Sequence, residues 1–266
     1  MQSKNIVITI LILLIVIGAS YLLLKKETTV SSPTTATSTS STSTSTTPSS
    51  STSSAKVHTS KAVVVVTARP VQPNYSTPLS FISSVSVGQQ TSLNAQFAAD
   101  TAAIAKNSND FDSWVDLGIV HRLAGDYTGA ATIWSYVSKA WPTNGVSFSN
   151  LGDLYLNYLK DYPASVSNYK IAIKNNPTNL DAYKNIFQVY TTTAYTGGVG
   201  AAADILKQGI MSNPKAVDLQ VILARYYASH GDLVNAKATY NAAINNAQGQ
   251  GETTLATQIQ TEAAGL

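Results

Sequence analysis

A spaced pattern of large and small residues in the second half of the chain limits its possible folds most strongly. The first copy of this pattern begins at Trp114 and ends at Pro142, and it places Gly118, Ala130 and Trp134 between them. Spacings of three and four residues put such positions on one face of a helix. The small residues allow two helices to cross closely, and a proline cannot continue the second helix. The pattern therefore predicts a helix–turn–helix unit.

Three further copies follow the first in phase. The closing residues Pro142, Pro177 and Pro214 lie 35 and 37 residues apart. The packing positions of the later copies are Leu151, Gly152, Tyr155, Ser165, Tyr169 and Ala172, then Tyr183, Ile186, Tyr190, Ala202, Leu206 and Gly209, and then Leu223, Ala224, Tyr227, Ala236, Tyr240 and Ala243. Repetition at this period favours a stack of helix pairs over an unrelated helical bundle.

Each copy departs from the pattern at one or two positions. The first has His121 where tyrosine is usual, and the second has one extra residue in the region 155–159. The third has Phe187 in place of glycine and a turn at 191–200 that is about three residues longer. The fourth has Gln220 in place of the leading aromatic residue and lacks a closing proline. The long turn is either tolerated variation or a binding loop.

The four copies resemble the tetratricopeptide repeat (TPR) family, whose unit follows the spacing W-x2-L-G-x2-Y…A-x3-F…P. The resemblance covers about residues 111–250 and implies an all-α, TPR-type α-solenoid of antiparallel helix pairs. A helix at about 92–106 is expected before the first repeat, and a capping helix after the last one. The expected domain spans 90–266, with repeats at about 111–144, 145–179, 180–216 and 217–250 and the capping helix at 252–264.

The resemblance also implies a binding surface, because the first helices of TPR units line a concave face that binds peptides or other proteins. No cofactor is implied. Chaperone-binding members hold a terminal carboxylate with a lysine, asparagine and arginine clamp, which this chain does not reproduce. The positions carried over to the concave face are Asp112, Val115, Ile119, Arg122, Ser149, Asp153, Leu156, Asn157, Asp181, Lys184, Gln188, Thr191, Val221, Arg225 and Ser229.

The N-terminal segment Ile6–Leu24 contains no charged side chain and is flanked by Lys4 and by Lys25 and Lys26. As a helix it would extend roughly 28 Å, which is close to the thickness of a bilayer core. It is therefore predicted to be an uncleaved transmembrane helix within a membrane anchor at 1–26. The alternative is a signal peptide cleaved near the small residues 18–20.

The next segment is dominated by hydroxyl side chains, because 23 of the 27 residues 28–54 are serine or threonine. Such a tract has almost nothing apolar to bury and predicts a disordered stalk at 27–60. Tracts of this kind are typical of glycosylated stalks outside the cell, so the repeat domain is expected to be extracytoplasmic. The alternative is an unmodified cytoplasmic linker. Residues 61–89 contain three prolines and are expected to form an extended linker.

Composition excludes several classes of function. The chain has no cysteine and three histidines, which leaves no thiolate metal site and little material for a histidine site. Residues 90–266 carry eleven basic and thirteen acidic side chains, so a nucleic-acid partner is not expected. The sequence contains no catalytic motif, and His121 and His230 are expected to be a packing residue and a helix-end residue. The protein is expected not to be an enzyme.

Two functions remain. The first is a membrane-anchored protein-interaction module, a scaffold or adaptor, that binds protein or peptide partners on its concave face. The alternative is a structural cell-surface or filament-associated protein that self-associates through its repeats.

Overall fold

The computed structural model describes residues 69–198 and 200–266. The chain divides into a unit at Met1–Val63 and a second unit at Val64–Leu266, and the described residues all belong to the second. The predicted transmembrane helix at 6–24, the stalk at 27–60 and the linker up to residue 68 lie outside the described residues.

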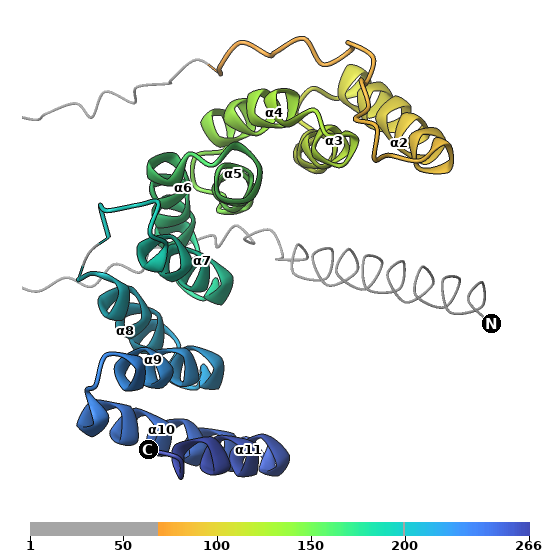
Figure 1. Cartoon of the computed structure of the whole chain (residues 1–266). Helices are drawn as coiled ribbons and strands as arrows, with labels where there is room; N and C mark the ends of the chain where they lie inside the picture. The colour runs from red at the N-terminus through yellow and green to blue at the C-terminus, as the bar shows by residue number, and fades with distance from the viewer. Residues whose placement is uncertain (1–68, 199) are drawn as a thin grey trace, which may run out of the picture. The chain divides into compact units, whose positions relative to one another are not determined.

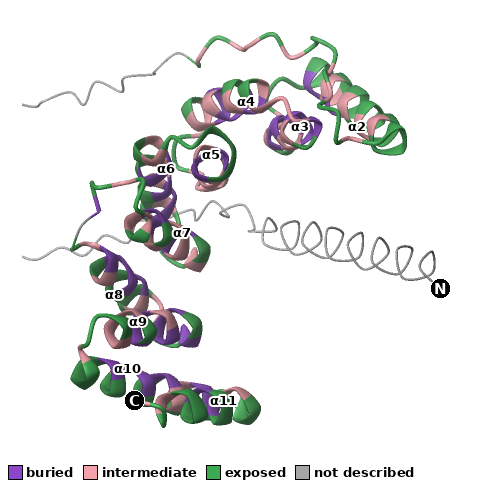
Figure 2. Ribbon diagram, in the orientation of Figure 1, coloured by how far each residue is buried: buried purple, intermediate pink, exposed green. Residues whose placement is uncertain are grey.

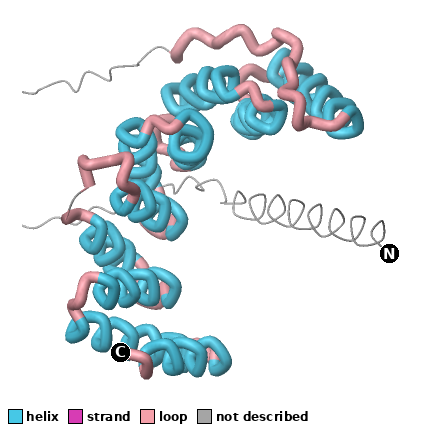
Figure 3. Tube along the Cα trace, in the orientation of Figure 1, coloured by secondary structure: helices cyan, strands magenta, loops and turns pink. Residues whose placement is uncertain are grey.

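The second unit is a row of helices, and its described residues include no β-strand (Figure 3). The helices are α2 (Val87–Lys106), α3 (Phe111–Ala124), α4 (Tyr127–Ala140), α5 (Val146–Leu154), α6 (Tyr162–Asn175), α7 (Leu180–Thr191), α8 (Ala202–Ser212), α9 (Val217–Ser229), α10 (Leu233–Gly249) and α11 (Thr253–Ala263). Each packs against the next one along the chain (Figure 1). The expectation of an all-α solenoid of helix pairs is therefore confirmed for the described residues.

Four helix pairs repeat along this row, and the name A helices is used below for α3, α5, α7, α9 and α11. The B helices are α4, α6, α8 and α10. Buried residues concentrate where neighbouring helices face one another (Figure 2). This distribution is expected when each unit buries its apolar surface only against its neighbours.

Small residues on the A helices make room for aromatic residues on the B helices. A Cβ atom added to Gly118 would overlap the indole of Trp134, and one added to Gly152 would lie 2.8 Å from the ring of Tyr169. In the fourth pair the same position is Ala224, which is fully buried. The glycines of the first two pairs are therefore required by the close approach of the two helices.

The third pair departs from this pattern at both positions. Phe187 stands where the A helices of the other three pairs carry glycine or alanine, and Leu206 stands where the B helices of those pairs carry an aromatic residue. Both side chains belong to one apolar cluster. The ring of Phe187 meets Tyr226 of α9 edge-on at 5.6 Å.

The loop that precedes an A helix is tied to that helix by one side-chain hydrogen bond. In the first, third and fourth pairs the donor lies six residues after the accepting carbonyl. These bonds run from Trp114 Nε1 to Ser108 O (3.1 Å), from Tyr183 Oη to Pro177 O (3.3 Å) and from Gln220 Nε2 to Pro214 O (3.3 Å). Gln220 therefore lacks the aromatic ring but keeps the hydrogen bond.

An asparagine near the end of each later B helix donates to the closing proline of the preceding repeat. The bonds run from Asn175 Nδ2 to Pro142 O (3.0 Å), from Asn213 Nδ2 to Pro177 O (3.0 Å) and from Asn246 Nδ2 to Pro214 O (2.9 Å). The accepting carbonyls lie in the loops just beyond the ends of α4, α6 and α8. The same bonds join consecutive repeats.

The extra residue in the region 155–159 is accommodated as a π-helical turn, η1 (Tyr155–Leu159), which continues α5. The turn ends at Lys160, whose φ of 56° is left-handed, and Asp161 then caps α6. One residue added to an α-helix widens a single turn in this way. The insertion therefore leaves the following helix in register.

The folded region begins earlier than the sequence predicts. Helix α2 starts at Val87, before the expected helix start at 92 and before the expected domain boundary at 90. Ser86 caps it, since Gln89 N donates to Ser86 Oγ and Ser86 N donates to Gln89 Oε1. This reciprocal capping box fixes the helix start.

Residues 69–85 also pack against the first repeat, although they are not helical. The guanidinium of Arg69 lies 4.3 Å from the ring centre of Trp141, and Arg69 Nε donates to Tyr136 Oη. Tyr75 meets Trp114 edge-on at 5.2 Å. The described part of the expected 61–89 linker is therefore a strap on the domain, held by aromatic and cation–π contacts.

Helix α2 buries the carboxylate of Asp100 against α3. Asp100 Oδ1 accepts a hydrogen bond from Gln96 Nε2, and Oδ2 is buried with no hydrogen-bond partner in the described part of the chain. Burial raises the pKa of Asp100 to about 6, the Gln96 hydrogen bond opposes this, and the charges of Asp116 and Asp110 add to it. The contact between α2 and α3 therefore carries an electrostatic cost at neutral pH.

Gly118→Ala tests the helix crossing directly. Because the new methyl group would overlap Trp134, we expect a loss of about 1–3 kcal/mol in the free energy of unfolding. Gly88→Ala in α2 is the control, since nothing lies within 4 Å of its added Cβ, and it should be neutral or stabilising by up to about 1 kcal/mol. Urea denaturation measures both. Equal stability of the two variants would contradict the crossing as described.

Asp100→Asn tests the buried carboxylate. The pKa of Asp100 is about 6 in the folded state and about 3.8 in the unfolded chain, so on raising the pH the unfolded chain loses this proton first. The free energy of unfolding therefore falls as pH rises from about 4 to about 6. The loss should be roughly 2–3 kcal/mol at pH 7, and the asparagine variant should lack it. Urea denaturation at pH 4 and pH 7 measures the difference. The exposed Asp112→Asn variant should retain the wild-type loss.

Candidate interaction surface

The A helices form a continuous surface, called the A face below, because successive A helices contact one another. Helix α3 contacts α5, and α5 contacts α7. Polar side-chain contacts join successive A helices, where η1 is counted with α5 and Asn179 with α7, which it caps. The contacts are Arg122 Nη1 to Tyr158 Oη (3.1 Å), Asn179 Nδ2 to Ser149 Oγ (2.9 Å), Lys184 Nζ to Asp218 Oδ2 (3.1 Å) and Arg225 Nε to Glu262 Oε1 (2.7 Å).

Most of the predicted site residues lie on accessible parts of this face, and several contact one another. Asn157 Nδ2 donates to Asp153 Oδ1, and Lys184 bridges Asp181 at 2.7 Å and Asp218 at 3.1 Å. The remaining predicted residues that are exposed or half-buried are Asp112, Ile119, Arg122, Ser149, Gln188, Thr191, Arg225 and Ser229.

Three predicted residues are buried. Val115 packs in a cluster with Ile104 of α2, and Leu156 packs in the cluster of the second and third repeats. Val115 and Leu156 are therefore packed within the domain, and their role in binding a partner stays a prediction. Val221 is 8 % exposed and lines a groove.

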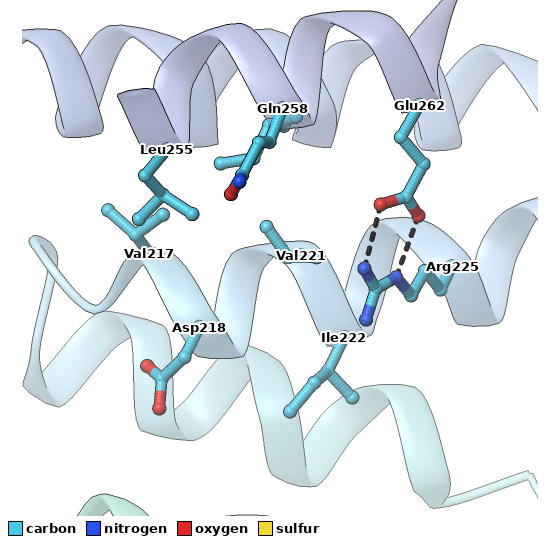
Figure 4. A pocket seen from close by; sticks show the side chains of 9 residues that line it. Val217, Asp218, Val221, Ile222, Arg225, Leu255, Gln258 and Glu262 are labelled. Atoms are coloured by element: carbon cyan, nitrogen blue, oxygen red, sulfur yellow. Dashed lines mark hydrogen bonds and ion pairs between the residues drawn. The ribbon is translucent and has the colours of Figure 1, made fainter. Parts of the chain in front are cut away.

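This groove lies between α9 and α11, has a volume of about 370 Å³ and is mostly apolar. Its walls are Val217, Val221 and Ile222 from α9 and Leu255, Gln258 and Ile259 from α11. Asp218 lies at one end, and the Arg225–Glu262 pair closes the other (Figure 4). The groove is suited to an apolar side chain of a partner segment that carries polar groups on either side of it.

The Arg225–Glu262 pair is bidentate, with both nitrogen–oxygen distances at 2.7 Å. Tyr240 Oη also donates to Glu262 Oε1 at 2.6 Å. The hydrogen bond from Arg225 lowers the pKa of Glu262 to about 2, and burial with the Glu262 contact raises the pKa of Tyr240 to about 12. These charge-assisted bonds hold α11 beside α9 and α10 and define the groove.

The sequence pattern missed the residues that α11 contributes, namely Glu262, Leu255, Gln258 and Ile259. One signal was available. Glu262 follows Arg225 by 37 residues, which is the largest interval between closing prolines in this chain. A residue one repeat after a predicted A-face position is therefore a candidate for contact with it.

The two histidines outside the first unit have the expected structural settings. His121 is buried, and its Nδ1 lies 2.8 Å from Asp126 Oδ2 at the turn between α3 and α4. His230 is exposed at the end of α9. Residues 69–198 and 200–266 contain no group of three or more histidine, aspartate or glutamate side chains placed to hold a metal ion.

Among the described helices, none has both the length and the apolar character needed to cross a membrane. No family model matches the chain, and no curated protein matches it.

Solved structures with a similar fold include MamA, with 16% identity over 63% of this chain and 98% of that one, at a TM-score of 0.49. YrrB, described as a TPR protein with an unusual peptide-binding site, has 14% identity over 62% and 84%, at 0.45. A thermophilic TPR protein of Thermus thermophilus has 20% identity over 65% and 95%, at 0.42. These likenesses concern the fold.

Glu262→Gln tests whether the bidentate pair holds α11. The variant lacks the negative charge that Arg225 and Tyr240 bind, so the backbone amides of α11 should exchange faster with solvent. The free energy of unfolding should fall by about 1 kcal/mol or less, because the pair is partly exposed. Hydrogen exchange with mass spectrometry measures this. Glu252→Gln, at the exposed start of α11, should leave the exchange unchanged. Similar exchange in both variants would contradict the role of the pair.

Proposed function

We propose that this protein is a membrane-anchored interaction module that binds a segment of another protein on its A face. The observation that carries the proposal is the apolar groove between α9 and α11, which is open at the surface and bounded by charged side chains. Apolar hollows with a polar rim are characteristic of recognition sites. The neighbouring A-face residues Gln188, Thr191 and Ser229 would supply polar contacts around such a segment.

The anchoring part of the proposal rests on the sequence alone. An uncharged segment at 6–24 has the length of a membrane span, and the serine and threonine tract at 28–54 would hold the domain away from the bilayer. With a stalk of this composition, the repeat domain would lie outside the cytoplasm. The module would then serve as a scaffold or adaptor for proteins at the membrane.

Gln258→Trp tests the groove without disturbing the core. Gln258 is exposed and lines the groove, so an indole at this position would occupy the space that a partner side chain needs. The wild-type full chain should retain a set of proteins from membrane extract in mild detergent. In the Gln258→Trp sample these proteins should be at least tenfold less abundant, which corresponds to a loss of about 1.4 kcal/mol or more in the free energy of binding.

The matched control is Gln260→Trp, which adds the same side chain to an exposed position of α11 outside the groove. It should retain the wild-type set of proteins. Quantitative mass spectrometry compares the three samples, and circular dichroism checks that helicity is equal. If Gln258→Trp retained the same set as wild type, the groove would not be the binding site.

Protease accessibility tests the proposed topology. Trypsin added to intact cells should release a fragment that contains the repeats, because the stalk would be exposed outside the cell. An antibody against α11 detects the fragment, and a cytoplasmic protein serves as the control for cell integrity. Full protection of the repeats in intact cells, with cleavage after lysis, would contradict an extracytoplasmic domain.

A further inference from the structure

The strap at residues 69–85 has one half-buried aromatic side chain between two exposed polar ones. Tyr75 is half-buried and meets the ring of Trp114 edge-on, with the ring centres 5.2 Å apart. Its neighbours Asn74 and Ser76 are both exposed. Because the aromatic contact holds Tyr75 on the domain, Asn74 and Ser76 are presented to solvent at one place on the strap.

The side-chain amide of Asn74 is bound through its oxygen alone. Ser76 N donates to Asn74 Oδ1 at 3.1 Å, and Ser76 Oγ donates to the same oxygen at 3.0 Å. A backbone N–H can only donate, so the atom that it meets is the amide oxygen. Asn74 Nδ2 makes no hydrogen bond within residues 69–198 and 200–266. An exposed residue therefore offers a free amide nitrogen, with a hydroxyl bound to its own carbonyl oxygen.

Three other asparagines form the same turn, in which Oδ1 accepts a hydrogen bond from the backbone nitrogen two residues later. They are Asn107, Asn144 and Asn176. Each of them lies between two consecutive helices, where the turn leads the chain from one helix into the next. Asn74 lies in no such connection. The helix pairs therefore do not account for its turn.

Asn74 also differs from these asparagines in the residues that follow it. The triplet Asn74-Tyr75-Ser76 has a hydroxyl residue at its third position and no proline at its second, which is the acceptor pattern for N-linked glycosylation. Asn107 and Asn144 have no hydroxyl residue two places on. No other asparagine of the chain meets the pattern.

Asn176 is a matched comparison within the same chain. Thr178 N and Thr178 Oγ1 both donate to Asn176 Oδ1, at 3.1 and 2.7 Å, as Ser76 does to Asn74. All three residues of this triplet are exposed, but its second residue is Pro177, which the acceptor pattern excludes. The two turns therefore differ at the residue that decides acceptance.

We propose that Asn74 is the acceptor of an N-linked glycan. The inference rests on the proposed function, because such glycans belong to surface loops of secreted segments and so require the repeat domain to lie outside the cytoplasm. A glycan at this place would be a bulky, solubilising group where the stalk meets the first repeat.

The donor is an oligosaccharide carried on a polyprenyl phosphate, which a transferase of the membrane supplies. Asn74 Nδ2 forms a bond to the anomeric carbon of the first sugar, and the bond from that carbon to the phosphate oxygen breaks. The lipid phosphate leaves with the electron pair of the broken bond and takes up the proton that Nδ2 loses. No oxidant or reductant is required.

Mass spectrometry of the full chain tests the proposal, with protein purified from the membranes of the cells that produce it naturally. Fragmentation of the proteolytic peptide that contains residue 74 should locate a sugar on the amide of Asn74, as distinct from sugars on nearby hydroxyl groups. Asn74→Gln and Ser76→Ala should each lose this mass, because one displaces the amide and the other removes the hydroxyl. Ser76→Thr keeps the hydroxyl and should retain the sugar.

Asn176→Gln is the matched control, since it removes an asparagine from the same turn. It should leave the sugar at Asn74 unchanged, and Asn176 should be unmodified in the wild type. Circular dichroism confirms that each variant is folded. An unmodified Asn74 in the wild type would overturn the proposal, and so would a sugar on this peptide that persists in both Asn74→Gln and Ser76→Ala.

The outcomes for the glycan and for the proposed function can be told apart. An unmodified Asn74 in cells from which trypsin releases the repeats refutes the glycan and leaves the extracytoplasmic domain standing. An unmodified Asn74 with fully protected repeats refutes both. A sugar on Asn74 with unchanged protein capture by Gln258→Trp supports the glycan and refutes the groove as the binding site.

Discussion

The close crossing of the two helices in each pair is the constraint on which the rest of the structure depends. Gly118 faces Trp134 and Gly152 faces Tyr169, so the aromatic residue of one helix fills the space that a side chain on the other would occupy. Close-packed interiors tolerate little change in volume at such points. The crossing sets the position of each B helix, and the B helix in turn sets where the next A helix begins.

Connections between repeats convert the pairs into a continuous surface. Asparagines of the B helices bind proline carbonyls of the preceding repeat, and polar contacts link successive A helices. The last of these contacts joins α9 to α11 through Arg225 and Glu262. Helix α11 therefore covers the apolar end of the solenoid, as a capping unit must, and at the same time forms one wall of the groove.

The sequence pattern predicted the helix pairs because their packing positions repeat. It did not predict that residues 69–85 pack on the first repeat, since Arg69 and Tyr75 act through contacts distant in sequence. It also placed Val115 and Leu156 on the surface, because a repeat template ignores α2 and the π-helical turn. The groove was missed because the template ends before α11. At the departure Gln220 the hydrogen bond to the preceding loop is retained.

Hydrogen exchange of the full chain under native conditions tests most directly whether the helix crossings hold the repeats as one unit. The account predicts that amides near the crossing residues Gly118, Gly152, Phe187 and Ala224 exchange slowest and with similar protection, because opening one pair exposes its neighbours. Helix α11 should be protected together with α9 and α10. The account would be contradicted if a single pair were strongly protected and the amides of the other helices exchanged as fast as those of isolated peptides.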